Sequence, residues 1–137
     1  MRKTIEDLLQ APYWIVDILP AQVPADSPGQ YFAVEKYFLQ ERQLAEIKQK
    51  HIQLILKLNC YRDLSLDEEE TVNPPPQRIA DEMRKRMVCI RTGNSMILSE
   101  PDDTHLTVFQ PDSQLLELIK TLAPGEGLFV WEFGDQA

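Results

Sequence analysis

The stretch that most constrains the fold is residues 41–58, ERQLAEIKQKHIQLILKL, the longest periodic segment in the chain. Its apolar residues and one histidine recur at spacings of three and four: Leu44, Ile47, His51, Leu54, Ile55 and Leu58. This spacing places them on one face of an amphipathic α-helix. Because such a face needs an apolar surface to cover, we expect the second half of the chain to supply a sheet beneath it.

The end of this segment also fits a second interpretation. Alternate residues are apolar, as in a buried strand over residues 52–59: Ile52, Leu54, Leu56 and Leu58. Length favours the helix, because the periodic segment is longer than an ordinary strand. Ile55 distinguishes the two structures, since it belongs to the helical face but would point away from Leu54 on a strand.

Turn residues and changes in periodicity predict the other elements. Before the long helix we expect a short helix over residues 4–9, a strand over 13–19 and a helix over 28–39. After it we expect a helix from residue 76 to 85, strands over 87–91, 96–99 and 104–109, a helix after Asp112, and a last strand over 128–133. Gly93-Asn94 is typical of a two-residue hairpin loop. The second half is therefore β-β-β-α-β. The fold class is α+β, a single domain with an antiparallel sheet of about five strands covered by helices.

The predicted helix 28–39 is unusual in being apolar on more than one side, through Tyr31, Phe32, Val34, Tyr37, Phe38 and Leu39. Ser27 followed by Pro28 is a helix-start signal, a capping residue and then proline at the first helical position. A helix that is apolar all round is normally covered by other structure. We therefore expect this helix to be largely buried, or to form the interface of a homodimer.

Residues 63–77 have a different character, with a run of acidic residues followed by Pro74, Pro75 and Pro76. Like charges and prolines disfavour both helices and strands, so we expect a mobile, solvated loop. The spacing of a calcium-binding loop is absent, and three prolines are too few for a polyproline ligand.

The chain is acidic, with a net charge of −8, and the charge is unevenly placed. Residues 99–137 carry eight acidic residues and one basic residue, Lys120, a net charge of −7. This sign disfavours binding to a phosphate backbone, so we expect no nucleic-acid partner. It predicts instead an acidic docking face for another protein that has a basic face.

The two cysteines, Cys60 and Cys89, form neither a disulfide framework nor a zinc motif. Both have apolar neighbours, so we expect buried, reduced thiols. The first ten residues lack the apolar core of a signal peptide, and no apolar run is long enough to span a membrane. These features indicate a cytoplasmic protein without a membrane partner.

The best candidate for chemistry is the turn Glu100-Pro101-Asp102-Asp103-Thr104-His105, which gathers three carboxylates and an imidazole. Divalent metals accept such ligands, here Glu100, Asp102, Asp103 and His105. The candidate catalytic residues are Asp102, Asp103 and His105, with the imidazole beside a carboxylate as a general base. The same residues also suit an ordinary polar turn.

Two further polar residues interrupt apolar segments. His51 lies within the helical face, where we expect a packed histidine with one hydrogen-bond partner. Asp17 interrupts the strand 13–19, and it points either to solvent or, from the strand end, into a pocket.

Known catalytic motifs are missing from the sequence. It contains no Gly-x-Ser-x-Gly elbow, phosphate-binding loop, dinucleotide fingerprint or His-Glu-x-x-His pair, and it indicates no cofactor. We therefore expect a non-enzymatic protein-interaction module, of the adaptor, inhibitor or immunity type, that uses its acidic C-terminal third. The alternative is a small metal-dependent hydrolase with its site at Asp102, Asp103 and His105.

Overall fold

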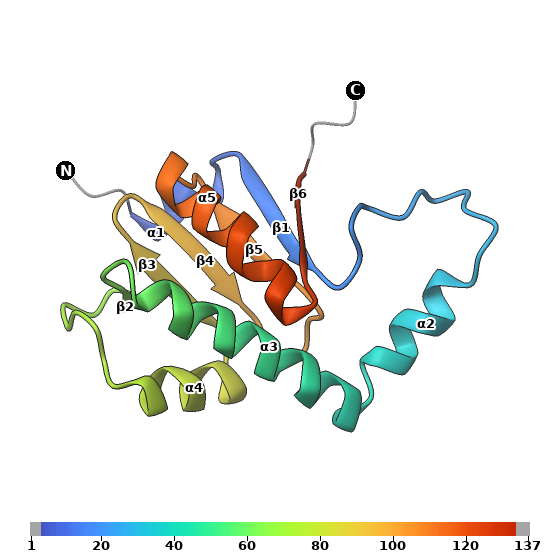
Figure 1. Ribbon diagram of the computed structural model, residues 1–137, viewed down its shortest axis with the longest axis horizontal. Coiled ribbons are helices and arrows are strands. Elements are labelled where there is room, and N and C mark those ends of the chain that lie inside the picture. Colours follow the sequence, from blue (N-terminus) through green and yellow to red (C-terminus); the bar gives the residue numbers. More distant parts are fainter. Residues whose placement is uncertain (1–3, 134–137) are drawn as a thin grey trace.

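A six-stranded antiparallel sheet packed with helices forms the fold in the computed structural model, which describes residues 4–133 (Figure 1). The helices are α1 (Ile5–Leu9), α2 (Tyr31–Phe38), α3 (Glu41–Asn59), α4 (Pro76–Lys85), α5 (Ser113–Leu122) and the 3₁₀ helix η1 (Ala123–Glu126). The strands are β1 (Tyr13–Asp17), β2 (Ser65–Leu66), β3 (Val88–Thr92), β4 (Ser95–Ser99), β5 (Leu106–Phe109) and β6 (Phe129–Glu132). The prediction of a single α+β domain is confirmed.

The strand order is β2-β3-β4-β5-β1-β6, so the first strand lies between the last two. The β3-β4-β5 meander turns at Gly93-Asn94, where Thr92 pairs with Ser95 and Gly93 has a φ of 58°. Hairpin loops of two residues need such a positive φ. α5 then carries the chain to β6, and its first turn is capped by Asp112, whose carboxylate accepts from Leu115 N. The predicted β-β-β-α-β order is confirmed, and the sheet has one strand more than expected.

Helices α3, α4 and α5 pack on one face of the sheet, which we call the first face (Figure 1). α3 is helical to Asn59, so the strand interpretation of residues 52–59 is wrong. Ile55 is completely buried with Leu54 and Leu58, as the helical spacing predicts. Ile52 is also buried, whereas Leu44 is only partly so, because the face of α3 that meets the sheet is wider at its C-terminal end. α3 therefore anchors the main core.

The opposite, second face of the sheet is covered only in part. α1 lies behind the sheet in Figure 1, and its Leu8 packs with Cys89, Met96 and Phe109. The half of this face that belongs to β1 and β6 is not covered by α1. The first part of the connection from β1 to α2 reaches this half instead, through Leu19, Ala21, Gln22 and Val23.

α2 departs most from prediction. It begins at Tyr31 after Gln30, so Ser27-Pro28 does not start it, and none of its residues is buried. The expectation of a largely buried helix is wrong, because the first face of the sheet is already filled by three other helices. α2 contacts α3 and extends from one end of the sheet, as Figure 1 shows.

Residues 63–77 contain the sixth strand, β2, which was not predicted because the segment is acidic. Ser65 and Leu66 pair with Arg91 and Ile90 and are buried. Asn73, at a φ of 54°, accepts from Leu64 N and so holds the loop against the strand. A strand of two residues is too short to produce an alternating pattern, which explains why the sequence did not reveal it. The mobility of the loop stays a prediction.

The two cysteines differ in environment. Cys89 is buried on β3, as expected, and both thiols are free. Cys60 is exposed, which contradicts the prediction, because it ends α3 at the C-cap, beyond the last turn that meets the sheet.

Candidate functional site

A cavity of about 310 Å³ lies on the uncovered half of the second face. It is bounded by strand residues, by the loop that follows β1 and by α2: Ile15, Asp17, Leu19, Ala21, Gln22, Val23, Tyr31, His105, Trp131 and Phe133. The alternation of side chains along β1 and β6 explains why some of these residues lie together. Alternation places Ile15 and Asp17 on the same face of β1, and Ile15 is paired with Trp131 on β6. Asp17 therefore faces a pocket, one of the two positions that its sequence context allowed.

Asp17 is the acidic group of this cavity. Its Oδ1 accepts from Ile18 N at 2.7 Å. Burial raises the pKa of the Asp17 carboxyl above its ordinary value, whereas the Ile18 amide and the nearby His105 act to lower it. Among residues 4–133, no lysine or arginine forms an ion pair with Asp17. The carboxylate is thus partly desolvated without a lysine or arginine as its counter-charge.

Aromatic groups form much of the remaining wall. Tyr31 donates a hydrogen bond from its hydroxyl to Glu35 Oε2 at 2.7 Å, and this bond raises the pKa of Tyr31 to about 12. The phenol therefore remains neutral. The Trp131 and Phe133 rings are 6.3 Å apart, and the buried Trp131 Nε1 donates no hydrogen bond to any part of the described chain. Buried indole nitrogens usually have a partner.

The acidic turn lies against a different group, Lys48 of α3. Lys48 is only 3 % exposed, and its Nζ donates to Ser99 Oγ at 3.1 Å and to the Glu100 carbonyl at 2.8 Å. Burial lowers the pKa of Lys48 to about 8, although the charges of Asp103, Asp102 and Glu100 oppose this effect. The turn thus accepts a hydrogen bond from a buried ammonium group through a backbone carbonyl, and its carboxylates act on that group through their charge.

His51 lies one turn beyond Lys48 on the same helix. It is completely buried, and neither Nδ1 nor Nε2 makes a hydrogen bond of regular geometry. Burial and the charge of Lys48 lower the pKa of His51 to about 3, although the Thr104 backbone acts in the opposite direction. The packed histidine is confirmed, and the Thr104 backbone is the group that acts on it as a hydrogen-bond partner, although not with regular geometry. A neutral imidazole in this position fills space in the core.

The structure divides the predicted site. His105 lines the cavity with Asp17, whereas Asp102 and Asp103 are not among the residues that line it and act on Lys48 instead. Within residues 4–133, no three His, Cys, Asp or Glu side chains are placed to hold a metal ion. Catalytic roles for Asp102, Asp103 and His105 stay predictions.

Sequence reasoning missed Lys48, Tyr31 and Trp131 as members of polar sites. A signal for Lys48 was present, because its spacing of four from Leu44 and three from His51 puts it on the buried face of the helix. For Trp131 the signal was the alternation of the last strand, which places it on one side together with Phe133.

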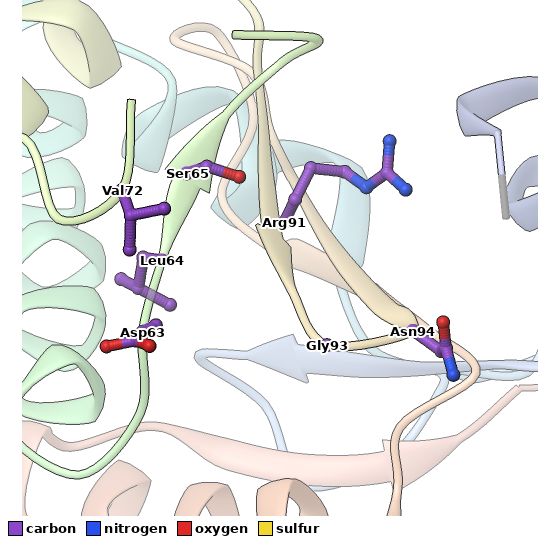
Figure 2. A pocket seen from close by; sticks show the side chains of 7 residues that line it. All are labelled: Asp63, Leu64, Ser65, Val72, Arg91, Gly93 and Asn94. Atoms are coloured by element: carbon purple, nitrogen blue, oxygen red, sulfur yellow. The ribbon is translucent and has the colours of Figure 1, made fainter. Parts of the chain in front are cut away.

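A separate cavity of about 390 Å³ lies where β2 meets the β3–β4 hairpin. Figure 2 shows that Asp63, Leu64 and Val72 lie on one side of it, whereas the Arg91 side chain extends away from them. Arg91 is buried and lies 3.5 Å from Glu68. The polar side chains of this cavity do not converge on one point, so its geometry indicates no chemistry.

The charge asymmetry of the sequence is partly balanced within the molecule. Arg62 forms an ion pair with Asp112 at 2.6 Å, and Lys57 forms one with Glu126. Basic residues of the middle third therefore neutralise two of the eight acids of the last third. The acids of the turn 100–103 retain no exposed basic partner in the described part of the chain.

None of the helices within residues 4–133 combines the length and apolarity that crossing a bilayer requires. Comparison of the chain with protein-family models, with curated proteins and with solved structures found no match.

Proposed function

We propose that the protein is a non-enzymatic protein-interaction module, and that α2 with the adjacent acidic turn 100–103 docks a basic, amphipathic segment of another protein. The observation that carries this proposal is that α2 is rich in large apolar side chains and buries none of its residues. The proposal retains the acidic C-terminal third as a source of charge, but it places the apolar contact on α2.

The apolar part of the docking surface is concentrated in residues 31–39, which are α2 and the residue after it. Of the eleven exposed large hydrophobic side chains in the described chain, five are Tyr31, Phe32, Val34, Tyr37 and Leu39. Phe32 is 81 % exposed and Tyr37 is 50 % exposed. Single exposed apolar residues are ordinary, but a group of this size on one short helix is typical of an interaction site.

The charge next to α2 favours a basic partner. The inner side of α2 lines a narrow cavity of about 30 Å³ together with Asp17 and Thr104. The acidic turn immediately precedes Thr104, so its carboxylates lie at the margin of the apolar surface. Lys48, which donates to Ser99 and to the Glu100 carbonyl, is buried. An approaching lysine or arginine would therefore meet exposed carboxylates.

The same charge argues against a second copy of the chain as the occupant. Each copy carries a net charge of −8, and like charges of this size oppose self-association at low salt. A homodimer through α2 was one prediction from the sequence. It is the competing outcome of the experiment below.

The test uses a labelled synthetic amphipathic helix of leucine and lysine, with a second peptide in which glutamate replaces lysine. Fluorescence anisotropy measures the binding of each peptide to the whole protein. We expect the lysine peptide to bind, the glutamate peptide to bind at least roughly tenfold more weakly, and binding of the lysine peptide to weaken as salt increases.

Two variants locate the surface. Phe32→Ser should weaken binding of the lysine peptide roughly tenfold or more, because it removes a large apolar anchor. Phe129→Ser is the matched control, since Phe129 is 44 % exposed on β6, outside α2, and should leave binding unchanged. Equal binding by the Phe32→Ser variant would refute the proposal. So would a dimer, seen by analytical ultracentrifugation, that Phe32→Ser dissociates.

A further inference from the structure

We propose that the cavity on the second face of the sheet binds a small organic ammonium ion, with the Asp17 carboxylate as its counter-charge and Tyr31, Trp131 and Phe133 as its aromatic wall. This site shares Tyr31 with the docking surface on α2 but is otherwise formed by other residues, and the inference does not rest on the docking function. It assigns a ligand class to a cavity that catalytic motifs in the sequence did not indicate.

The size of the cavity suits a small molecule. Its volume of about 310 Å³ is at the lower end of the range for ligand pockets. Strand residues of β1 and β6 form its floor, and Leu19, Gln22 and Val23 of the following loop lie across from them. A ligand in this position would be enclosed by the chain on several sides.

The charge of the lining selects a cation. The ten residues that bound the cavity include one acid, Asp17, and neither lysine nor arginine. Asp17 has lost part of its hydration, and in the structure its direct hydrogen bond comes from the neighbouring Ile18 amide. The titratable groups that act on Asp17 from the packed elements are His105, which precedes β5, and Glu35 on α2. A bound ammonium group would supply the positive charge that no lysine or arginine provides.

The aromatic wall favours an organic cation over a metal ion. Faces of tryptophan, tyrosine and phenylalanine rings attract ammonium groups, and quaternary ammonium ions are recognised by such rings in combination. Phe133 also stacks on Tyr13 at 4.9 Å, so the aromatic surface continues along the second face. Within residues 4–133, no group of three carboxylate, histidine or cysteine side chains is placed to hold a metal ion.

The experiment uses choline as the probe and its neutral isostere, 3,3-dimethylbutan-1-ol, as the control for shape. Both are titrated into the whole protein while the indole N–H resonance of Trp131 is followed by NMR. The Trp14→Phe variant identifies that resonance, since Trp14 and Trp131 are the two tryptophans of the chain. We expect choline to shift the Trp131 signal with saturation, and the isostere to bind roughly tenfold more weakly or worse.

Two charge variants test the role of Asp17. Asp17→Asn keeps the acceptor for the Ile18 amide but removes the charge, and it should weaken choline binding roughly tenfold. Glu132→Gln is the matched control, because Glu132 is the neighbouring acid on β6 but does not line the cavity, and its choline affinity should stay within about twofold of wild type. A peptide that carries trimethyllysine distinguishes a free metabolite from a modified protein side chain. The proposal is overturned if the isostere binds as tightly as choline, if Asp17→Asn binds normally, if only the peptide binds, or if no ligand shifts the signal.

Discussion

The strongest prediction from the geometry concerns the titration of Lys48. Its ammonium group is 3 % exposed and its pKa is lowered to about 8, from an ordinary value of 10.5. Between these two pKa values the unfolded chain binds a proton at Lys48 more often than the folded chain does. The free energy of unfolding must therefore increase with pH over this window.

The size of this effect follows from the same two values. Below the folded pKa the buried charge lowers the stability by about 3 kcal/mol relative to a neutral amine, and above the unfolded pKa the loss disappears. From about pH 7.5 to about pH 9.5, Lys48 alone should raise the free energy of unfolding by about 2 kcal/mol. Cys89 acts in the opposite direction in alkali, because burial raises the pKa of its thiol. A comparison with a Lys48 variant cancels that contribution.

The assay is urea unfolding of wild type and Lys48→Met at the two pH values. The difference in unfolding free energy between the two proteins should change by about 2 kcal/mol in favour of wild type as the pH rises. Lys48→Arg is the control, because arginine stays charged over this range and should give the same change. A change smaller than about 0.5 kcal/mol would show that the Lys48 ammonium is solvated and that the packing of α3 on Ser99 differs from the structure.

Three further predictions concern packing and exposure. Ile55→Ser should lower the free energy of unfolding by roughly 3 kcal/mol or more, because it leaves a void and a hydroxyl in the core; a urea midpoint near wild type would contradict the position of α3. A disulfide reagent should modify Cys60 in the native protein within minutes and Cys89 only after unfolding, and equal rates would contradict their different burial. Asp112→Asn should keep the cap of α5 but lose the ion pair with Arg62, at a cost of about 0.5 to 1 kcal/mol that falls with added salt; a loss independent of salt in thermal melts would assign the effect to the cap.

Much of the fold could be predicted because local signals agreed with the final packing. In α4 the apolar residues at helical spacing, Ile79, Ala80 and Met83, are the buried ones. The hairpin at Gly93 and the cap at Asp112 also formed as their residues predict. In these places periodicity, turn chemistry and burial all require the same structure.

The site was harder to predict, because its residues come from distant parts of the chain. Asp17 and His105 are in proximity only because β1 inserts between β5 and β6, and no local pattern reports the order of strands. Residues 100–105 were predicted to form one site for the opposite reason, because their acids lie close together in the sequence. In the structure the charges of those acids act on Lys48, whereas His105 lines the cavity. Closeness in sequence therefore gave a wrong prediction of which groups lie next to the acids of the turn and to His105.

The error over α2 has a physical cause that also supports its proposed role. An apolar helix must be covered by something, and its composition alone does not say by what. α3, α4 and α5 fill the first face of the sheet, whereas α1 and the loop after β1 cover only part of the second face. α2 extends from one end of the sheet rather than lying on either face, and Phe32 and Tyr37 remain exposed there. Under the docking proposal, a partner protein would cover this exposed apolar surface, and the acidic turn would favour a partner that is basic.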